Sequence, residues 1–95
     1  MPDLRPARTV RATITDRGAM LLDLRGRGRW YALTPSGALW WRHLADGATV
    51  REAADQVAEL FGGAPEEVHA DMTALAEQLV ARRLLWAPRL KRWRR

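Results

Sequence analysis

The sequence contains no cysteine, and none of its apolar runs approaches the roughly 20 residues of a membrane-spanning helix. The first absence excludes disulfide bonds and thiolate sites. The second argues against a membrane span. Residues 1–6 also lack the apolar block of a secretory signal peptide. We therefore expect a soluble chain that works in the cytoplasm.

Residues that could form a catalytic or metal site are scarce. The two histidines, His43 and His69, have no cysteine and no paired carboxylate at ligand spacing, so no metal site is predicted. There is no nucleophile elbow, and the glycine-rich segment 26–28 leads into a strand rather than a helix, unlike a phosphate-binding loop. We expect no enzymatic activity, no cofactor and no metal.

The net charge of +5 comes entirely from the C-terminal end. Residues 1–88 contain 11 arginines and 11 acidic residues, whereas residues 89–95 contain five cations and no acidic residue. Three interpretations of this tail stay open. It could be a solvated end, a segment that attracts an acidic precursor or a protein partner, or a salt-sensitive contact with nucleic acid or an anionic membrane.

The N-terminal third predicts three antiparallel strands. Residues 1–8 contain two prolines and few apolar side chains, and are expected to be an unordered, flexible lead-in. Apolar residues then alternate in the runs 9–15, 19–24 and 29–33, and the turns between them are too short for anything but antiparallel neighbours. The third run would lie at an edge of the sheet. In the second run, the residues expected to face the core are Met20, Leu22 and Leu24.

Three helices are predicted after the strands. Thr34 can cap a first helix over 35 to about 45, and Thr49 and Glu52 form a capping box for a second helix that ends at Gly62-Gly63. The third helix would run from 65 to about 83, before Leu84-Leu85-Trp86 folds back on the core and Pro88 ends order. The residues expected to be buried on the first two helices are Gly37, Trp40, Trp41, Leu44, Val50, Ala53, Ala54, Val57, Leu60 and Phe61.

These elements predict an α+β fold, in which a three-stranded antiparallel sheet is followed by three helices. The domain would span 9–87, between the flexible N-terminus and a basic tail over 88–95. This is the layout of a winged helix-turn-helix with the sheet first, a shape that suggests DNA binding. The acidic residues Glu66, Glu67 and Asp71 stand where a recognition helix would meet phosphates, which argues against nucleic acid. A small basic DNA-binding regulator remains the alternative function.

A set of mostly apolar positions between 12 and 86 carries a resemblance: Leu33, Thr34, Gly37, Trp40, Asp46, Gly47, Thr49, Val50, Ala54, Phe61, Val68, Asp71, Leu75, Leu79, Leu84 and Leu85. In this order they resemble the PqqD family, the recognition domains of pathways for ribosomally made, post-translationally modified peptides. Segments 22–25 and 28–33 are most similar to the stand-alone leader-binding proteins of lasso-peptide biosynthesis. Two positions differ, because Thr34 stands where the family commonly has Asn, and Arg83 where Gly is common.

The resemblance implies a protein that does no chemistry. Such a domain holds the leader segment of a precursor peptide and delivers it to a partner. In lasso systems this partner is a cysteine protease that removes the leader, and a separate cyclase then closes the ring. The leader is expected to lie as an added strand beside 29–33, with its side chains toward the third helix.

An exposed edge strand supports this interpretation independently, because its unpaired N–H and C=O groups attract a further strand. Asp71 could accept a hydrogen bond from a tyrosine hydroxyl or a backbone amide of the leader. The alternative is that it pairs with an arginine or faces water. The apolar positions of the third helix could equally belong only to the core. The predicted peptide-binding residues are Arg29, Trp30, Tyr31, Ala32, Leu33, Val68, Asp71, Met72, Leu75, Gln78, Leu79 and Arg82.

Overall fold

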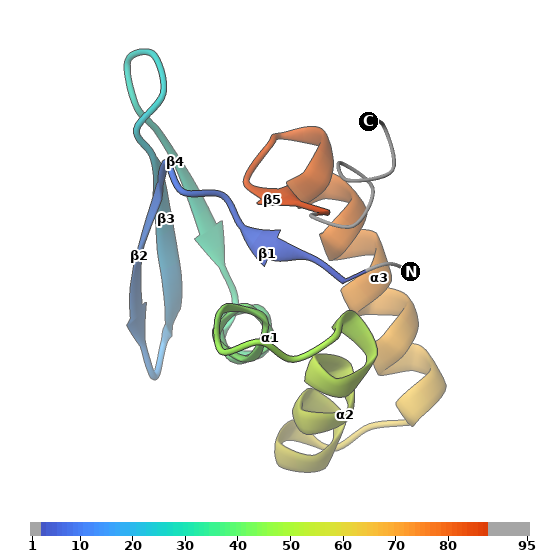
Figure 1. The fold of residues 1–95 in the computed structure, drawn as a ribbon. Coiled ribbons are helices and arrows are strands. Elements are labelled where there is room, and N and C mark those ends of the chain that lie inside the picture. The colour runs from blue at the N-terminus through green and yellow to red at the C-terminus, as the bar shows by residue number, and fades with distance from the viewer. Residues whose placement is uncertain (1–2, 88–95) are drawn as a thin grey trace, which may run out of the picture.

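The computed structural model of the chain describes residues 3–87. Its three main strands form one sheet, and the helices lie on one side of it (Figure 1). The predicted α+β class is confirmed, whereas the basic tail over 88–95 lies outside the described residues. No helix among residues 3–87 is long and apolar enough to cross a membrane. The elements are β1 (Arg5–Pro6), β2 (Val10–Thr15), β3 (Gly18–Asp23), β4 (Arg29–Leu33), α1 (Pro35–Ala45), α2 (Val50–Phe61), α3 (Pro65–Ala81) and β5 (Leu85–Trp86).

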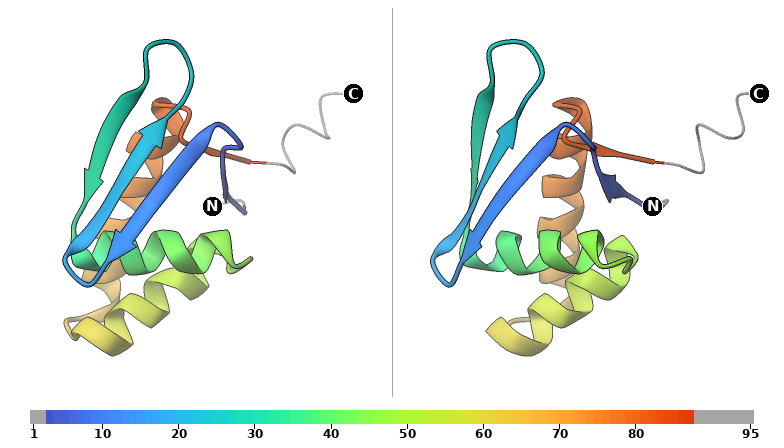
Figure 2. Two further views of the ribbon diagram at one scale, coloured as in Figure 1. Left: turned by 90° about the vertical axis from the view of Figure 1, so that its left-hand side faces the viewer. Right: turned by 60° about the vertical axis from the view of Figure 1, so that its left-hand side comes forward.

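The main sheet is an antiparallel meander in the order β2-β3-β4. Pairing between β3 and β4 runs from Ala19 opposite Leu33 to Asp23 opposite Arg29. The middle run is therefore central and the third run lies at an edge, as the sequence predicts. The turn between β3 and β4 extends beyond the helices (Figure 2).

The face of β3 that meets the core is the opposite of the predicted one. Ala19 and Leu21 are buried, with 6% and 0% of their surface exposed, whereas Met20 is 40% exposed. The prediction that Met20, Leu22 and Leu24 face the core is wrong. Residues 19–22 are all apolar, so alternation along the strand does not select a face. The partner strand selects it instead, because buried Leu33 lies opposite Ala19 and paired residues share a face.

Helix α1 begins directly after β4. The hydroxyl of Thr34 accepts a hydrogen bond from the N–H of Gly37 at 3.1 Å, which is the predicted cap. The helix then packs against the sheet, most closely on β3. Trp40, Trp41 and Leu44 are buried in this layer, which confirms them as core residues.

Helix α2 begins with the predicted capping box. The Thr49 side chain accepts from the Glu52 N–H at 3.0 Å, and the Glu52 carboxylate accepts from the Thr49 N–H at 2.9 Å. The predicted apolar stripe is buried from Val50 to Val57 only, because the last turn of α2 lies at the periphery of the helical layer (Figure 2). Leu60 and Phe61 are exposed there, so their predicted burial is wrong.

Residues 3–8, part of the segment that the sequence predicts to be a flexible lead-in, lie against the rest of the domain in this structure. β1 pairs antiparallel with β5 in a separate two-stranded sheet. Leu4 is 2% exposed, and the Arg5 guanidinium donates to the carbonyls of Gly47 and Ala48 at 3.1 and 3.2 Å. Pro6 is tolerated because a short edge strand needs few N–H donors.

The end of α3 is closed by a Schellman motif. The N–H of Leu84 donates to the Leu79 carbonyl and that of Arg83 to the Val80 carbonyl, both at 2.9 Å. Arg83 accordingly has a φ of +63°, in the left-handed region that favours glycine. This explains why glycine suits the position just before Leu84, and it means that arginine is conformationally strained there.

Replacing Arg83 with glycine should stabilise the fold. We expect Arg83→Gly to raise the free energy of unfolding by about 0.5–1 kcal/mol, because glycine has no Cβ to clash at positive φ. Urea denaturation of both proteins would measure the difference. The matched control is Arg82→Gly at the neighbouring position, where φ is −88° and no gain is expected. An unchanged or lower stability of Arg83→Gly would contradict this explanation.

Candidate functional site

Strand β4 has a free edge. It pairs with β3 on one side, and no strand of residues 3–87 pairs with its other side. The free edge therefore presents the unpaired backbone N–H and C=O groups of alternate residues. Arg29 is the one charged side chain among the five residues of the strand, so charge does little to block the approach of another strand.

Side chains along one side of α3 face β4. We call Leu75, Gln78 and Arg82 the α3 stripe. The hydroxyl of Tyr31 donates to Oε1 of Gln78 at 2.9 Å, and the guanidinium carbon of Arg82 lies 5.0 Å from the centre of the Tyr31 ring. Leu75, one turn before Gln78, lies beside Gly37, where an added Cβ would be 3.3 Å from Leu75 Cδ2. The stripe and the strand are thus connected through side chains, and Tyr31 and Arg82 line the same cleft.

Asp71 continues this stripe, because it precedes Leu75 by four residues on the same helix. Its side chain is exposed, and the structure shows no hydrogen bond or ion pair to it among residues 3–87. The alternative that Asp71 pairs with a neighbouring arginine therefore finds no support. The carboxylate is available to accept hydrogen bonds from a ligand.

The other predicted residues of α3 have different positions. Met72 and Leu79 are 7% and 0% exposed and belong to the core, so the prediction that their side chains line a groove is wrong. The helical period turns them away from the stripe of Leu75 and toward the interior. Val68 is half-buried and lies near Gly63, at the α2–α3 turn.

Trp30 and Tyr31 lie on opposite faces of the sheet. Tyr31 pairs with buried Leu21 and faces the helices, whereas Trp30 pairs with Leu22 and is 62% exposed on the outer face. Ala32 is also exposed on the outer face. Any strand added to β4 would therefore meet Trp30 on one face and Tyr31 on the other.

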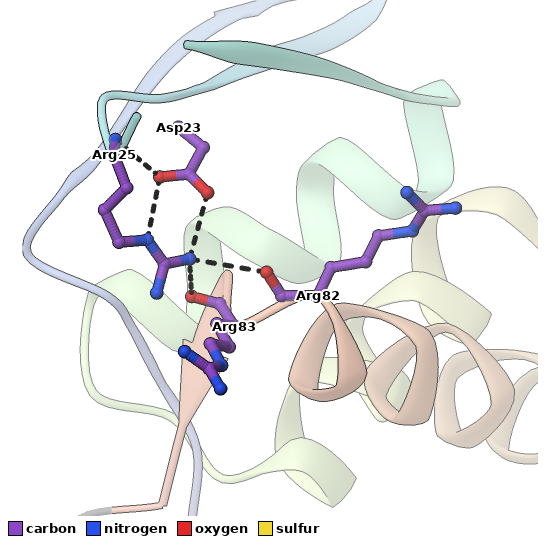
Figure 3. Close-up of polar contacts among 4 residues, drawn as sticks. All are labelled: Asp23, Arg25, Arg82 and Arg83. Carbon is purple, nitrogen blue, oxygen red and sulfur yellow. Dashed lines mark hydrogen bonds and ion pairs between the residues drawn. The ribbon is translucent and has the colours of Figure 1, made fainter. Parts of the chain in front are cut away.

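A polar junction holds the β3–β4 turn against the end of α3 (Figure 3). The Arg25 guanidinium donates to both carboxylate oxygens of Asp23, at 3.0 and 2.9 Å. It also donates to the backbone carbonyls of Arg83 and Arg82, at 2.7 and 3.3 Å. This junction ties one end of β4 to the stripe-bearing helix, and thereby fixes the spacing between them.

The same contacts shift the ionisation of the pair. The pKa of Asp23 lies below its ordinary value, chiefly because the Arg25 side chain and backbone N–H donate to the carboxylate, with a smaller contribution from the charges of Arg25 and Arg29. The pKa of Arg25 is raised by the same carboxylate. The sequence alone predicts no such contact for Arg25, because the carbonyls that it binds are 57 and 58 residues away.

A cleft of about 760 Å³ opens beside the junction, between the β3–β4 turn and the end of α3. Its lining includes the start of β4. The residues that line it are Asp23, Arg25, Gly26, Arg27, Gly28, Arg29, Trp30, Tyr31, Ala81, Arg82, Arg83 and Leu84. Within residues 3–87 the structure contains no cluster of side chains suited to a metal ion.

Comparison with known proteins gives a family and a fold. The family model described as coenzyme PQQ synthesis protein D (PqqD) matches residues 18–85. A structure described as TbiB1 in complex with the TbiA(beta) leader peptide is similar with a TM-score of 0.76 and 22% identity, over 85% of this chain and 93% of that chain. A structure of lasso peptide synthetase B1 complexed with the leader peptide has a TM-score of 0.76 and 24% identity, over 88% and 98%. No curated protein matches.

The Asp23–Arg25 junction should make stability depend on pH. Because the folded protein lowers the pKa of Asp23, the ionised carboxylate stabilises the fold above its ordinary pKa of 3.8, and this contribution is lost as the pH falls below that value. We expect the wild type to be more stable than Asp23→Asn at neutral pH, and the difference to shrink on acidification.

Denaturant unfolding of both proteins between neutral pH and pH of about 3 would test this. Asp16→Asn, in the turn at the other end of the sheet, is the matched control and should show no such pH-dependent difference. A gap between wild type and Asp23→Asn that stays constant with pH would rule out the ion pair as its cause.

Proposed function

The chain belongs to the PqqD family, and we propose that it binds the leader segment of a ribosomally synthesised precursor peptide as an additional strand on the free edge of β4. Recognition elements of this family are non-catalytic peptide-binding proteins. Both structurally similar proteins are described in complex with a leader peptide, one of them as a lasso peptide synthetase. We accordingly propose a lasso-peptide precursor as the source of the leader.

The observation that carries the proposal is the free edge of β4 beside the α3 stripe. Strand addition satisfies backbone groups that are otherwise left to water, and it needs no particular ligand sequence. A stripe of side chains next to the edge can then select among peptides. Leu75 offers an apolar surface, while Asp71, Gln78 and Arg82 offer a hydrogen-bond acceptor, an amide and a cation.

The two faces of the sheet would contact alternate side chains of the leader. Side chains on the inner face would lie between Tyr31 and the α3 stripe, whereas those on the outer face would pack beside Trp30. Trp30 and Tyr31 are residues of the type that contributes most to binding energy at interfaces. Of Leu33, buried beneath α1, only the backbone would take part.

Asp71 is well suited to orient the leader. Its carboxylate is exposed on the stripe and forms no hydrogen bond or ion pair with another residue of the range 3–87. A charged acceptor forms stronger hydrogen bonds than a neutral one. We propose that it accepts from a tyrosine hydroxyl or a backbone N–H of the leader.

Binding of duplex DNA by α3 finds less support. Glu66 and Glu67 are exposed in the first turn of the helix, and exposed Asp71 follows in the second turn. These carboxylates would repel phosphates at the end of a helix that a winged helix-turn-helix protein inserts into the major groove. A DNA-binding regulator would have to use another surface.

The bound leader would be delivered to a protein partner. We propose a leader peptidase of the cysteine-protease type, followed by a cyclase that acts on the released core peptide, with all steps in the cytoplasm where the precursor is made. The chain itself would contribute affinity for the leader and no catalysis. A leader peptidase of this type should therefore cleave its precursor faster when the chain is present.

Truncation of Tyr31 should weaken leader binding. With a fluorescent synthetic leader of a lasso-peptide precursor, we expect Tyr31→Ala to raise Kd by about tenfold or more, because the ring connects the free edge to the α3 stripe. Fluorescence anisotropy would measure Kd. The matched control is Phe61→Ala, an exposed aromatic on α2, which should leave Kd unchanged. Equal affinities for all three proteins would contradict the site.

Loss of the Asp71 charge should have a smaller effect. We expect Asp71→Asn to weaken binding by roughly three- to tenfold, because an amide oxygen accepts a weaker hydrogen bond than a carboxylate. The control is Glu77→Gln, an exposed carboxylate on the opposite side of α3. A larger loss for Glu77→Gln than for Asp71→Asn would place the leader on another face of the helix.

A further inference from the structure

The cleft between the β3–β4 turn and the end of α3 has a strong excess of positive charge. Five arginines line it, against one aspartate. The rest of residues 3–87 has six arginines against ten aspartates and glutamates, and is therefore acidic. The excess is therefore a local feature of this cleft rather than a property of the whole fold.

Only one of these arginines forms an ion pair with a carboxylate within residues 3–87. Arg25 binds both oxygens of Asp23 and two backbone carbonyls, so the pair is close to neutral and serves to hold the turn (Figure 3). Asp23 in turn has its two carboxylate oxygens occupied by Arg25. It cannot neutralise the remaining guanidinium groups as well.

Four arginines thus remain to line the cleft: Arg27, Arg29, Arg82 and Arg83. None of them forms an ion pair with another residue in the range 3–87. Arg29 lies opposite Asp23 across the strands and acts on it through charge alone, without a hydrogen bond. Arg82 lies over the ring of Tyr31. Gathering four like charges is unfavourable unless an anion joins them.

The position of the cleft relates it to the proposed binding edge. Arg29 is the first residue of β4, and Tyr31 lines the same cleft. A strand added along β4 would therefore pass over or end at the cleft. Its side chain at this point would come within reach of guanidinium groups from both the turn and α3.

We propose that this arginine cleft binds an acidic side chain of the leader peptide, an aspartate or glutamate located where the added strand reaches the β3–β4 turn. This inference rests on the proposed function and adds the register of the leader on β4. The acidic residue at one end of the bound segment would lie at the β3–β4 turn. Guanidinium groups present paired N–H donors that match a carboxylate. The junction of Arg25 with the end of α3 keeps the two sides of the cleft together.

Binding of charge-altered leaders would test the inference. The probe is the synthetic leader of a lasso-peptide precursor, in its natural form and with every Asp and Glu replaced by Asn and Gln. The proteins are the wild type, Arg27→Glu in the cleft, and the matched control Arg17→Glu in the turn at the opposite end of the sheet. Anisotropy titrations at low and high salt would give Kd for each pair.

We expect the natural leader to bind Arg27→Glu roughly three- to fivefold more weakly than wild type at low salt, with a smaller difference at high salt. Arg17→Glu should bind like the wild type. The neutral leader should bind the wild type more weakly than the natural leader does, and should be indifferent to Arg27→Glu. A leader in which lysine replaces the acidic residue proposed to reach the cleft should bind Arg27→Glu more tightly than the wild type.

Equal binding of the natural and neutral leaders would overturn the acidic register and leave strand addition intact, whereas binding of neither leader would overturn both proposals. A short DNA duplex that binds the wild type, displaces the leader and loses affinity in Arg27→Glu would assign the cleft to phosphates instead. That result would also contradict the inference.

Discussion

The path of the chain at Thr34 determines that one edge of β4 stays unpaired within residues 3–87. The Thr34 side chain caps α1 immediately after the last residue of the strand, so the chain leaves the sheet without room for a fourth strand of its own. Helix α1 then crosses the inner face of the sheet, and α3 returns beside the strand. The free edge is thus a consequence of where one helix begins, and the side chains next to it come from a helix about 40 residues later.

Three contacts fix the space between β4 and α3, one toward each end of the strand and one in its middle. At one end, Gly37 has no side chain, which allows Leu75 to approach the start of α1. At the other end, Arg25 connects the β3–β4 turn to the last carbonyls of α3. Tyr31 bridges the middle through Gln78. We expect a site supported in this way to change little in shape when a strand is added, and a preorganised edge loses less entropy on binding.

The features that the sequence predicts correctly depend on neighbours along the chain. The caps of α1 and α2 and the antiparallel meander follow from residues at most a few positions apart. The features it misses depend on distant partners. β1 is only two residues long and is held by β5, the buried face of β3 is selected by Leu33, and the role of Arg25 requires carbonyls 57 and 58 residues away. Periodicity placed Met72, Leu75 and Leu79 on one helix correctly, but it does not distinguish the core side from the side that faces β4.

Strand addition alone does not explain why such a domain would prefer one peptide over another. Backbone pairing is available to any extended chain, so selectivity has to come from side chains that flank the edge. The structure supplies three kinds in separate places: an aromatic on the outer face at Trp30, an apolar and polar stripe on the inner face from Asp71 to Arg82, and a cationic cleft at the turn. Because a strand alternates its side chains between two faces, a shift of one residue would exchange the outer and inner contacts. The three surfaces together would therefore determine both which leader binds and in which register.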